Sequence, residues 1–193
     1  LLNTGKILVC GFGIGLGWYH TDGVDNTSIQ TKLTLTPMYT SGSDYDGKNA
    51  KKIFASQQSF FTILNSGKIL CLGNNIHDHL GANFTTWETD GSSYGQFLSM
   101  TTTDDYDGTN AKSISAYTQS PQHSYAAVSG RTFVLLNSGK LLSCGNNEYG
   151  QLGVNDTTNS GTLKPVDISG GYDGTNAVAV TQMNNTVAVL LNT

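Results

Sequence analysis

The sequence predicts an all-β fold made of repeated units, each with about four antiparallel strands. Two markers recur in phase along its 193 residues. The first, Leu-Leu-Asn-Ser-Gly-Lys or a close variant, occupies 1–6, 63–68, 135–140 and, in part, 190–193. The second, Tyr-Asp-Gly-Thr-Asn-Ala or a close variant, occupies 45–50, 106–111 and 172–177. Such self-similarity indicates tandem repeats. We therefore expect a single domain over 1–193, with units at about 1–62, 63–134 and 135–189 and a further unit beginning at 190–193.

Each unit carries strand and hairpin signals. Short apolar runs such as Lys140–Cys144 and Ala177–Val180 lie between clusters of Gly, Asn and Asp, a pattern typical of strands joined by tight turns. Asn, Asp and Gly tolerate the positive φ that such turns require. No window shows the apolar stripe of an amphipathic helix. Four-stranded units too small to bury their own faces are typical of β-propeller blades, so we predict three blades.

The third unit carries the most specific motif. Residues 135–153 read LLNSGKLLSCGNNEYGQLG, and KPVDI follows at 164–168. This run resembles the repeat of the regulator of chromosome condensation family, with its Gly-x-Asn and Gly-Gln-Leu-Gly elements and a Pro-Val strand. The second unit matches in part through GNNIHDHLG at 73–81, whereas GFGIGLGWYH at 11–20 lacks both asparagines. The resemblance implies a ring of seven blades, completed by further blades of the same polypeptide or by association of copies.

We interpret this motif as a structural corner. Its glycines suit turns that leave no room for a Cβ, its asparagines can bond to nearby backbone, and its leucine can pack inward. The motif comprises Gly145, Asn146, Asn147, Gly150, Gln151, Leu152 and Gly153.

Composition narrows the range of partners. The net charge is −4 with only 10 basic residues, so we expect no nucleic-acid partner. The apolar runs are too short to insert into a membrane, and we expect a soluble chain. The segment at 42–49 has P-loop spacing but carries Asn49 where Ser or Thr would bind magnesium, and the glycine-rich run at 7–17 lacks the third glycine of a dinucleotide loop. We therefore predict no cofactor.

We also predict no catalytic residues and no metal. His77 and His79 would share a face of an extended segment, but no third ligand accompanies them. Asp44 and Asp46 resemble part of a calcium loop, yet no bidentate glutamate follows, which favours an Asx turn. The three cysteines are expected to be buried free thiols.

The second unit contains an insertion. Ala111 to Leu136 spans 11 residues more than Ala50 to Leu64, which places the extra residues within Tyr117 to Gly130. Loops inserted on a rigid scaffold are common contact sites, and exposed aromatics are common anchors. The predicted partner-binding residues are Trp18, Tyr19, Trp87, Tyr117, Gln119, Gln122 and His123. Two segments compete for the next strand start: His123–Ser124, which resembles the family's His-Ser start, and SGRTFVLL at 129–136.

These observations predict a non-catalytic binding or structural module that presents its loops to a protein or glycan partner. We consider a module that is secreted or that is exposed on a virion, a cell surface or a large assembly. Two alternatives follow from the family resemblance. One is a nucleotide-exchange regulator of a small GTPase, like the family's founding member, and the other is a secreted enzyme-inhibitor-like propeller.

Overall fold

The computed structural model describes residues 1–12, 31–38, 44–57, 59–73, 75, 78–82, 97–119 and 129–192. These residues form strands and no helix, and none of them belongs to a helix that could cross a membrane. The strands are β1 (Leu8–Phe12), β2 (Thr31–Pro37), β3 (Ala50–Ala55), β4 (Ser59–Leu64), β5 (Ile69–Gly73), β6 (Leu98–Ser99), β7 (Ala111–Gln119), β8 (Ser129–Leu136), β9 (Leu141–Gly145), β10 (Ser160–Pro165), β11 (Ala177–Met183) and β12 (Thr186–Leu191).

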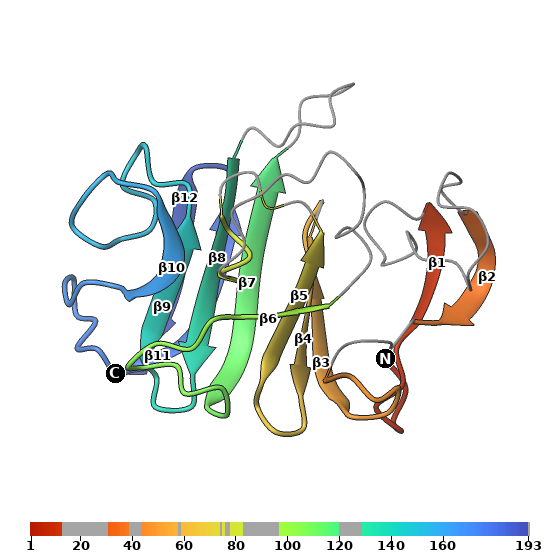
Figure 1. Cartoon of the computed structure of the whole chain (residues 1–193). Helices are drawn as coiled ribbons and strands as arrows, with labels where there is room; N and C mark the ends of the chain where they lie inside the picture. The colour runs from red at the N-terminus through yellow and green to blue at the C-terminus, as the bar shows by residue number, and fades with distance from the viewer. Residues whose placement is uncertain are drawn as a thin grey trace.

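The strands form four antiparallel sheets arranged side by side (Figure 1). Two sheets are complete, with orders β3-β4-β5-β6 and β7-β8-β9-β10, and they are flanked by the pairs β1-β2 and β11-β12. The all-β prediction and the blade interpretation are confirmed. In the two complete sheets, the Asn-Ser-Gly marker is the turn between the second and third strands. Units that begin at this marker therefore cut each sheet through its middle.

The core lies between neighbouring sheets. One buried cluster joins Phe61 and Ile63 of β4 to Val134 of β8 and Leu142 of β9. Strands β4 and β8 are buried along their whole length, whereas β12 is largely exposed despite its similar sequence. The difference arises because β4 and β8 lie inside complete sheets, while no described strand pairs with the second edge of β12.

The first strands of successive sheets lie next to one another: β7 contacts β3, and β11 contacts β7. The Lys52 ammonium donates to the carbonyl of Lys112 at 2.7 Å, and the hydroxyls of Ser56 and Thr118 share a hydrogen bond of 2.6 Å. Gln182 of β11 donates to the Ser115 carbonyl of β7 at 2.6 Å. These bonds place β3, β7 and β11 in one row across the sheets.

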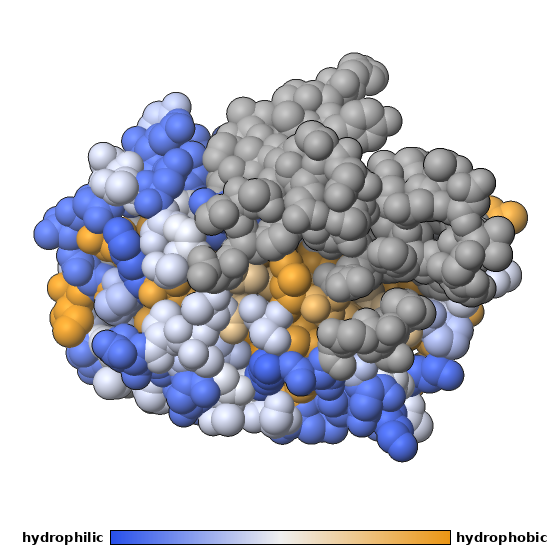
Figure 2. Space-filling model, viewed as in Figure 1, coloured by the Kyte–Doolittle hydropathy of each residue, from blue (hydrophilic) through white to orange (hydrophobic). Residues whose placement is uncertain are grey.

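One end of the molecule is built from the repeated turns, and we call it the latch end. It comprises the turns at 44–49, 65–68, 102–110, 137–140 and 171–176. Figure 1 shows it as the lower edge, and Figure 2 shows hydrophilic residues along the same edge. The tyrosine of each Tyr-Asp-Gly turn reaches back to the preceding sheet. The hydroxyls of Tyr45, Tyr106 and Tyr172 accept the backbone N–H groups of Ile7, Ile69 and Leu141 at 2.7, 2.8 and 2.8 Å.

The turns of the latch end also require glycine where two of them meet. A Cβ on Gly67, which has φ +89°, would lie 1.8 Å from the carbonyl oxygen of Thr109 in the next Tyr-Asp-Gly turn. Each of these turns is closed by its aspartate: the carboxylates of Asp107 and Asp173 accept the N–H groups of Thr109 and Thr175 at 2.7 Å. These bonds hold the pKa of both carboxyls below its usual range.

Candidate functional site

The opposite end, which we call the loop end, carries the connections β1–β2, β3–β4, β5–β6, β7–β8, β9–β10 and β11–β12 (Figure 1). Equivalent connections differ in length there. β1 and β2 are separated by 18 residues (13–30), β5 and β6 by 24 (74–97), and β9 and β10 by 14 (146–159). At the latch end the corresponding connections have 12, 11 and 11 residues (38–49, 100–110 and 166–176). The variation between blades is therefore concentrated at the loop end.

The predicted partner-binding residues are compared with the strands by their order in the sequence. Trp18 and Tyr19 fall between β1 and β2, and Trp87 falls between β5 and β6. These three, together with Gln122 and His123, lie outside the described residues. Tyr117 and Gln119 are described, and they lie at the loop-end tip of β7.

Strands β7 and β8 form a longer hairpin than β3 and β4. The β3–β4 pairing ends at Ala55 opposite Phe60, which corresponds to Ala116 opposite Thr132. The later hairpin adds the pairs Tyr117–Arg131, Thr118–Gly130 and Gln119–Ser129. Part of the insertion thus extends the sheet toward the loop end. Of the two candidate strand starts, 129–136 is β8, whereas His123 and Ser124 lie outside the described residues.

Arg131 lies inside this extension. The Tyr117 ring covers its guanidinium at 4.7 Å, and the Tyr117 hydroxyl donates to Gln119 at 3.4 Å. Arg131 is 0 % exposed, and its Nη2 donates to the carbonyl of Asn184 in the β11–β12 turn. Burial lowers the pKa of Arg131 from its usual value. Sequence reasoning did not select Arg131, although a lone arginine beginning an apolar strand is a readable signal.

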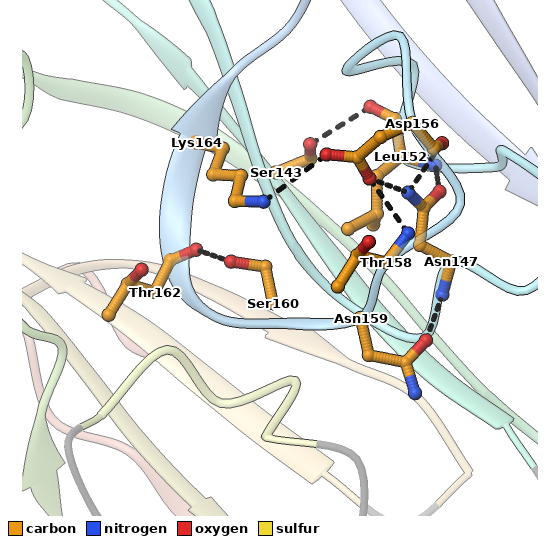
Figure 3. Close-up of polar contacts among 9 residues, drawn as sticks. All are labelled: Ser143, Asn147, Leu152, Asp156, Thr158, Asn159, Ser160, Thr162 and Lys164. Atoms are coloured by element: carbon orange, nitrogen blue, oxygen red, sulfur yellow. Dashed lines mark hydrogen bonds and ion pairs between the residues drawn. The ribbon is translucent and has the colours of Figure 1, made fainter.

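The Gly-Asn-Asn motif forms the corner between β9 and β10 (Figure 3). The Asn147 side chain accepts the Leu152 N–H at 2.8 Å and donates to the Asp156 carbonyl and carboxylate at 2.9 and 3.0 Å. Lys164 pairs with the same carboxylate at 3.5 Å. Gly150 and Gly153 have φ values of +74° and +68°. This frame fixes the corner and leaves Tyr149 73 % exposed at its tip.

The second unit contains a version of the same corner. Asn75 accepts the Leu80 N–H at 2.8 Å, as Asn147 does for Leu152, and Asp78 adopts φ +56° in the place of Gly150. His79 replaces Gln151 and is fully buried. Its ring packs on Gly130 of the next sheet so closely that a Cβ there would lie 2.4 Å from Nδ1.

The side chains considered as metal ligands are engaged in other contacts or lie outside the described residues. Asp44 pairs with Lys68 at 2.5 Å, and this partner lowers the pKa of Asp44. Asp46 accepts the Lys48 N–H at 2.9 Å in an Asx turn. His79 is fully buried with its ring against Gly130, and His77 is not among the described residues. Within the described part of the chain, no three His, Cys, Asp or Glu side chains form a possible metal site.

The cysteine prediction is wrong at one position. Cys71 and Cys144 are buried free thiols, and burial raises the pKa of both, that of Cys144 to about 12. Cys10 is exposed. It occupies the place of Cys144, whose sulfur donates to the His79 carbonyl of the preceding corner at 3.5 Å, and the described residues contain no such corner before β1.

Four-stranded antiparallel sheets joined in tandem define the described residues as blades of a β-propeller. Two models of the regulator of chromosome condensation (RCC1) repeat match the chain, one at residues 138–183 and the other at 124–151. Residues 124–183 therefore match the RCC1-type repeat. The first match includes the whole corner motif. The second includes the motif up to Gln151 and also covers β8.

Solved structures share this fold. Human WBSCR16 is 16 % identical with a TM-score of 0.58, and the match covers 88 % of this chain and 37 % of that one. Prp20p from Saccharomyces cerevisiae, whose structure was reported with its binding to Gsp1p and histones, is 16 % identical with a TM-score of 0.59, covering 91 % and 35 %. Yeast RCC1 (Prp20), in a structure with Kap60, is 17 % identical with a TM-score of 0.53, and the match covers 86 % of this chain and 32 % of that one. The chain thus spans about a third of their length. No curated protein sequence matches it.

Proposed function

We propose that this chain is a non-catalytic module that binds a protein partner through its loop end. The observation that carries the proposal is the contrast between the two ends of the same blades. Each latch turn repeats one tyrosine bond and one closely approached glycine, whereas equivalent loop-end connections differ in length and sequence. A rigid scaffold with one variable end is the usual arrangement of a recognition surface.

The described loop end offers two aromatic side chains for such contacts. Tyr149 is exposed on a corner whose backbone is fixed by Asn147 and Gln151, so little conformational entropy is lost when a partner covers its ring. Tyr117 is half-buried over Arg131 and marks the tip of the extended hairpin. Aromatic side chains held in this way are frequent anchors of protein interfaces.

Proteins with the same fold bind protein ligands: Prp20p was reported with Gsp1p and histones, and yeast RCC1 with Kap60. These properties belong to those proteins. They support a protein in preference to a glycan as the partner class here. Exposure on a virion, cell surface or large assembly is a narrower form of this proposal. A nucleotide-exchange role like that of the family's founding member and a role as a secreted enzyme inhibitor are alternatives to it, and the similarity to Prp20p favours the first of these two.

Site-specific photocrosslinking tests the proposal. A photoreactive residue is placed at Tyr149 or Tyr117, and at Ser66 as an exposed control on the latch end. We expect crosslinks to a discrete protein from the loop-end positions and none from Ser66. Equal crosslinking from both ends would contradict the proposal. Crosslinks that disappear after glycosidase treatment of the partner would assign a glycan instead.

A further inference from the structure

The guanidinium of Arg131 is buried, and no acidic side chain among the described residues pairs with it. Its Nη2 donates to the Asn184 carbonyl, but Nε and Nη1 have no hydrogen-bond partner in the part of the chain that the structure describes. The ion pairs of the described residues join Lys68 to Asp44, Lys140 to Asp105 and Lys164 to Asp156, and none of them includes Arg131. The β7–β8 connection at 120–128 contains no Asp or Glu that could neutralise it.

An arginine cannot escape this situation by losing its proton. Its ordinary pKa is so high that the side chain stays charged even when burial lowers it. A buried charge is tolerated when it is paired and its donors are satisfied. The described residues therefore provide neither acceptors for Nε and Nη1 of Arg131 nor a negative charge beside them.

The blade framework does not need a cation at this position. Register places Arg131 opposite Gly145 in the second sheet and Ser59 opposite Gly73 in the first. The equivalent residue of the β11–β12 pair, counted back from Leu191 opposite Ala177, is Thr186. Ser59 and Thr186 are neutral, so the charge of Arg131 is specific to this blade and points to a ligand.

A second donor belongs to the same surface of β8. Ser129 and Arg131 are two residues apart in a strand, so their side chains lie on the same face. Ser129 is 8 % exposed, and its hydroxyl has no hydrogen-bond partner among the residues that the structure describes. Three donors, the Ser129 hydroxyl and two guanidinium nitrogens, are thus unsatisfied on one face, beside the Tyr117 ring.

We propose that Arg131 and Ser129 form a receptor for a single anionic group, a carboxylate or a phosphate, between the β7–β8 hairpin and the β11–β12 turn. The planar guanidinium matches both groups, and the serine hydroxyl supplies a further donor. The site lies at the loop end, but its ligand is a small anion. The anion proposal can therefore be tested independently of the protein partner proposed above.

The test uses the sole arginine of the chain as its own reporter. Its Nε–Hε group gives a single NMR resonance, which is followed while inorganic phosphate or acetate replaces chloride at constant ionic strength. We expect a saturable shift with at least one anion, and the stronger anion distinguishes a phosphate from a carboxylate ligand. If phosphate and acetate change the chemical shift of this resonance no more than chloride does, the proposal is overturned.

Variants provide an independent readout. At hundredfold excess over its Kd, the bound anion is expected to raise the Tm by about 5 °C. Arg131→Met should abolish this rise and Ser129→Ala should weaken it, whereas Lys51→Met, which removes an exposed charge, should leave it intact. The comparison is made within each variant with and without anion, so a change in basal stability does not affect it. An equal rise in Arg131→Met would refute the assignment.

Discussion

The two ends of each blade are built on opposite rules. At the latch end, three copies use the same tyrosine bond to the preceding sheet at nearly the same distance. At the loop end, the corner of the third unit is held by Asn147, whereas the second unit substitutes His79 for Gln151 and Asp78 for Gly150. The comparison teaches that the contacts repeated in every blade lie at the latch end, whereas the contacts at the loop end differ from blade to blade. Substitutions that separate stability from binding test this division.

The largest effect is expected from Gly67→Ala at the latch. Gly67 has a positive φ, and a Cβ would lie 1.8 Å from the Thr109 carbonyl oxygen. The variant should lose about 3 kcal/mol of unfolding free energy or more in urea denaturation, because both strain and overlap are introduced.

Gly170→Ala is the matched control for that substitution. Gly170 also has a positive φ, +59°, but a Cβ would meet nothing within 4 Å. It should therefore lose only about 1 kcal/mol. Equal losses in the two variants would show that the close approach at the latch does not matter.

Removing one latch hydroxyl should have the next largest effect. Tyr106→Phe leaves the buried N–H of Ile69 without its acceptor, which should cost about 1 to 3 kcal/mol. Tyr149→Phe, at an exposed loop-end position, should change stability by less than about 0.5 kcal/mol. Chemical denaturation of the two variants measures the difference. If Tyr106→Phe leaves the free energy of unfolding unchanged, the Tyr106 hydroxyl does not stabilise the latch end.

The latch should also be sensitive to alkali. Burial raises the pKa of Tyr106 to about 12, above the ordinary value of 10.0. Below pH 10 the phenol is neutral in both the folded and unfolded chain, so its stabilising contribution is fully present. As the pH rises toward 12, only the unfolded phenol ionises, and roughly 2 kcal/mol should be lost. Urea denaturation from pH 9 to 12 checks this, and Tyr106→Phe should show a shallower decline.

The smallest change in stability is expected at the loop end. Tyr149→Ala should leave the urea midpoint unchanged, because the ring is exposed and the corner is fixed by Asn147. Once the partner is known, the same variant should weaken binding about tenfold. Ser66→Ala on the latch end should leave binding intact. A Tyr149→Ala variant that binds normally would move the interface to the other loop-end residues.

The sequence allowed the fold to be predicted because its information is local and repeated. Turn residues and alternating apolar runs indicated the strands, and the spacing excess before Leu136 located the β7–β8 extension. Sheet boundaries were not predictable from the markers, since the turn at 65–68 lies inside a sheet. The tyrosine of each Tyr-Asp-Gly turn was visible in all three copies, but the backbone group that it meets belongs to another sheet.

Residues whose role depends on the next sheet were the hardest to predict. His79 and His77 were paired by sequence spacing, yet the ring of His79 is enclosed against Gly130, about fifty residues further along the chain. In the sequence, Arg131 was notable only as the single arginine. Its burial, and the lack of a partner for Nε and Nη1 among the described residues, cannot be inferred from neighbouring residues. Contacts between sheets therefore defined the part of the site that motifs did not reveal.

The position of the Asn-Ser-Gly turn in the middle of each sheet has an evolutionary consequence. A duplication or exchange of DNA with its ends at this turn transfers the last two strands of one blade and the first two of the next. Every blade assembled in this way is a hybrid of two genetic units, joined by the β4–β5 or β8–β9 ladder. New blades are thus inserted with pairing edges already matched, while the long loop-end connections remain whole within each exchanged segment.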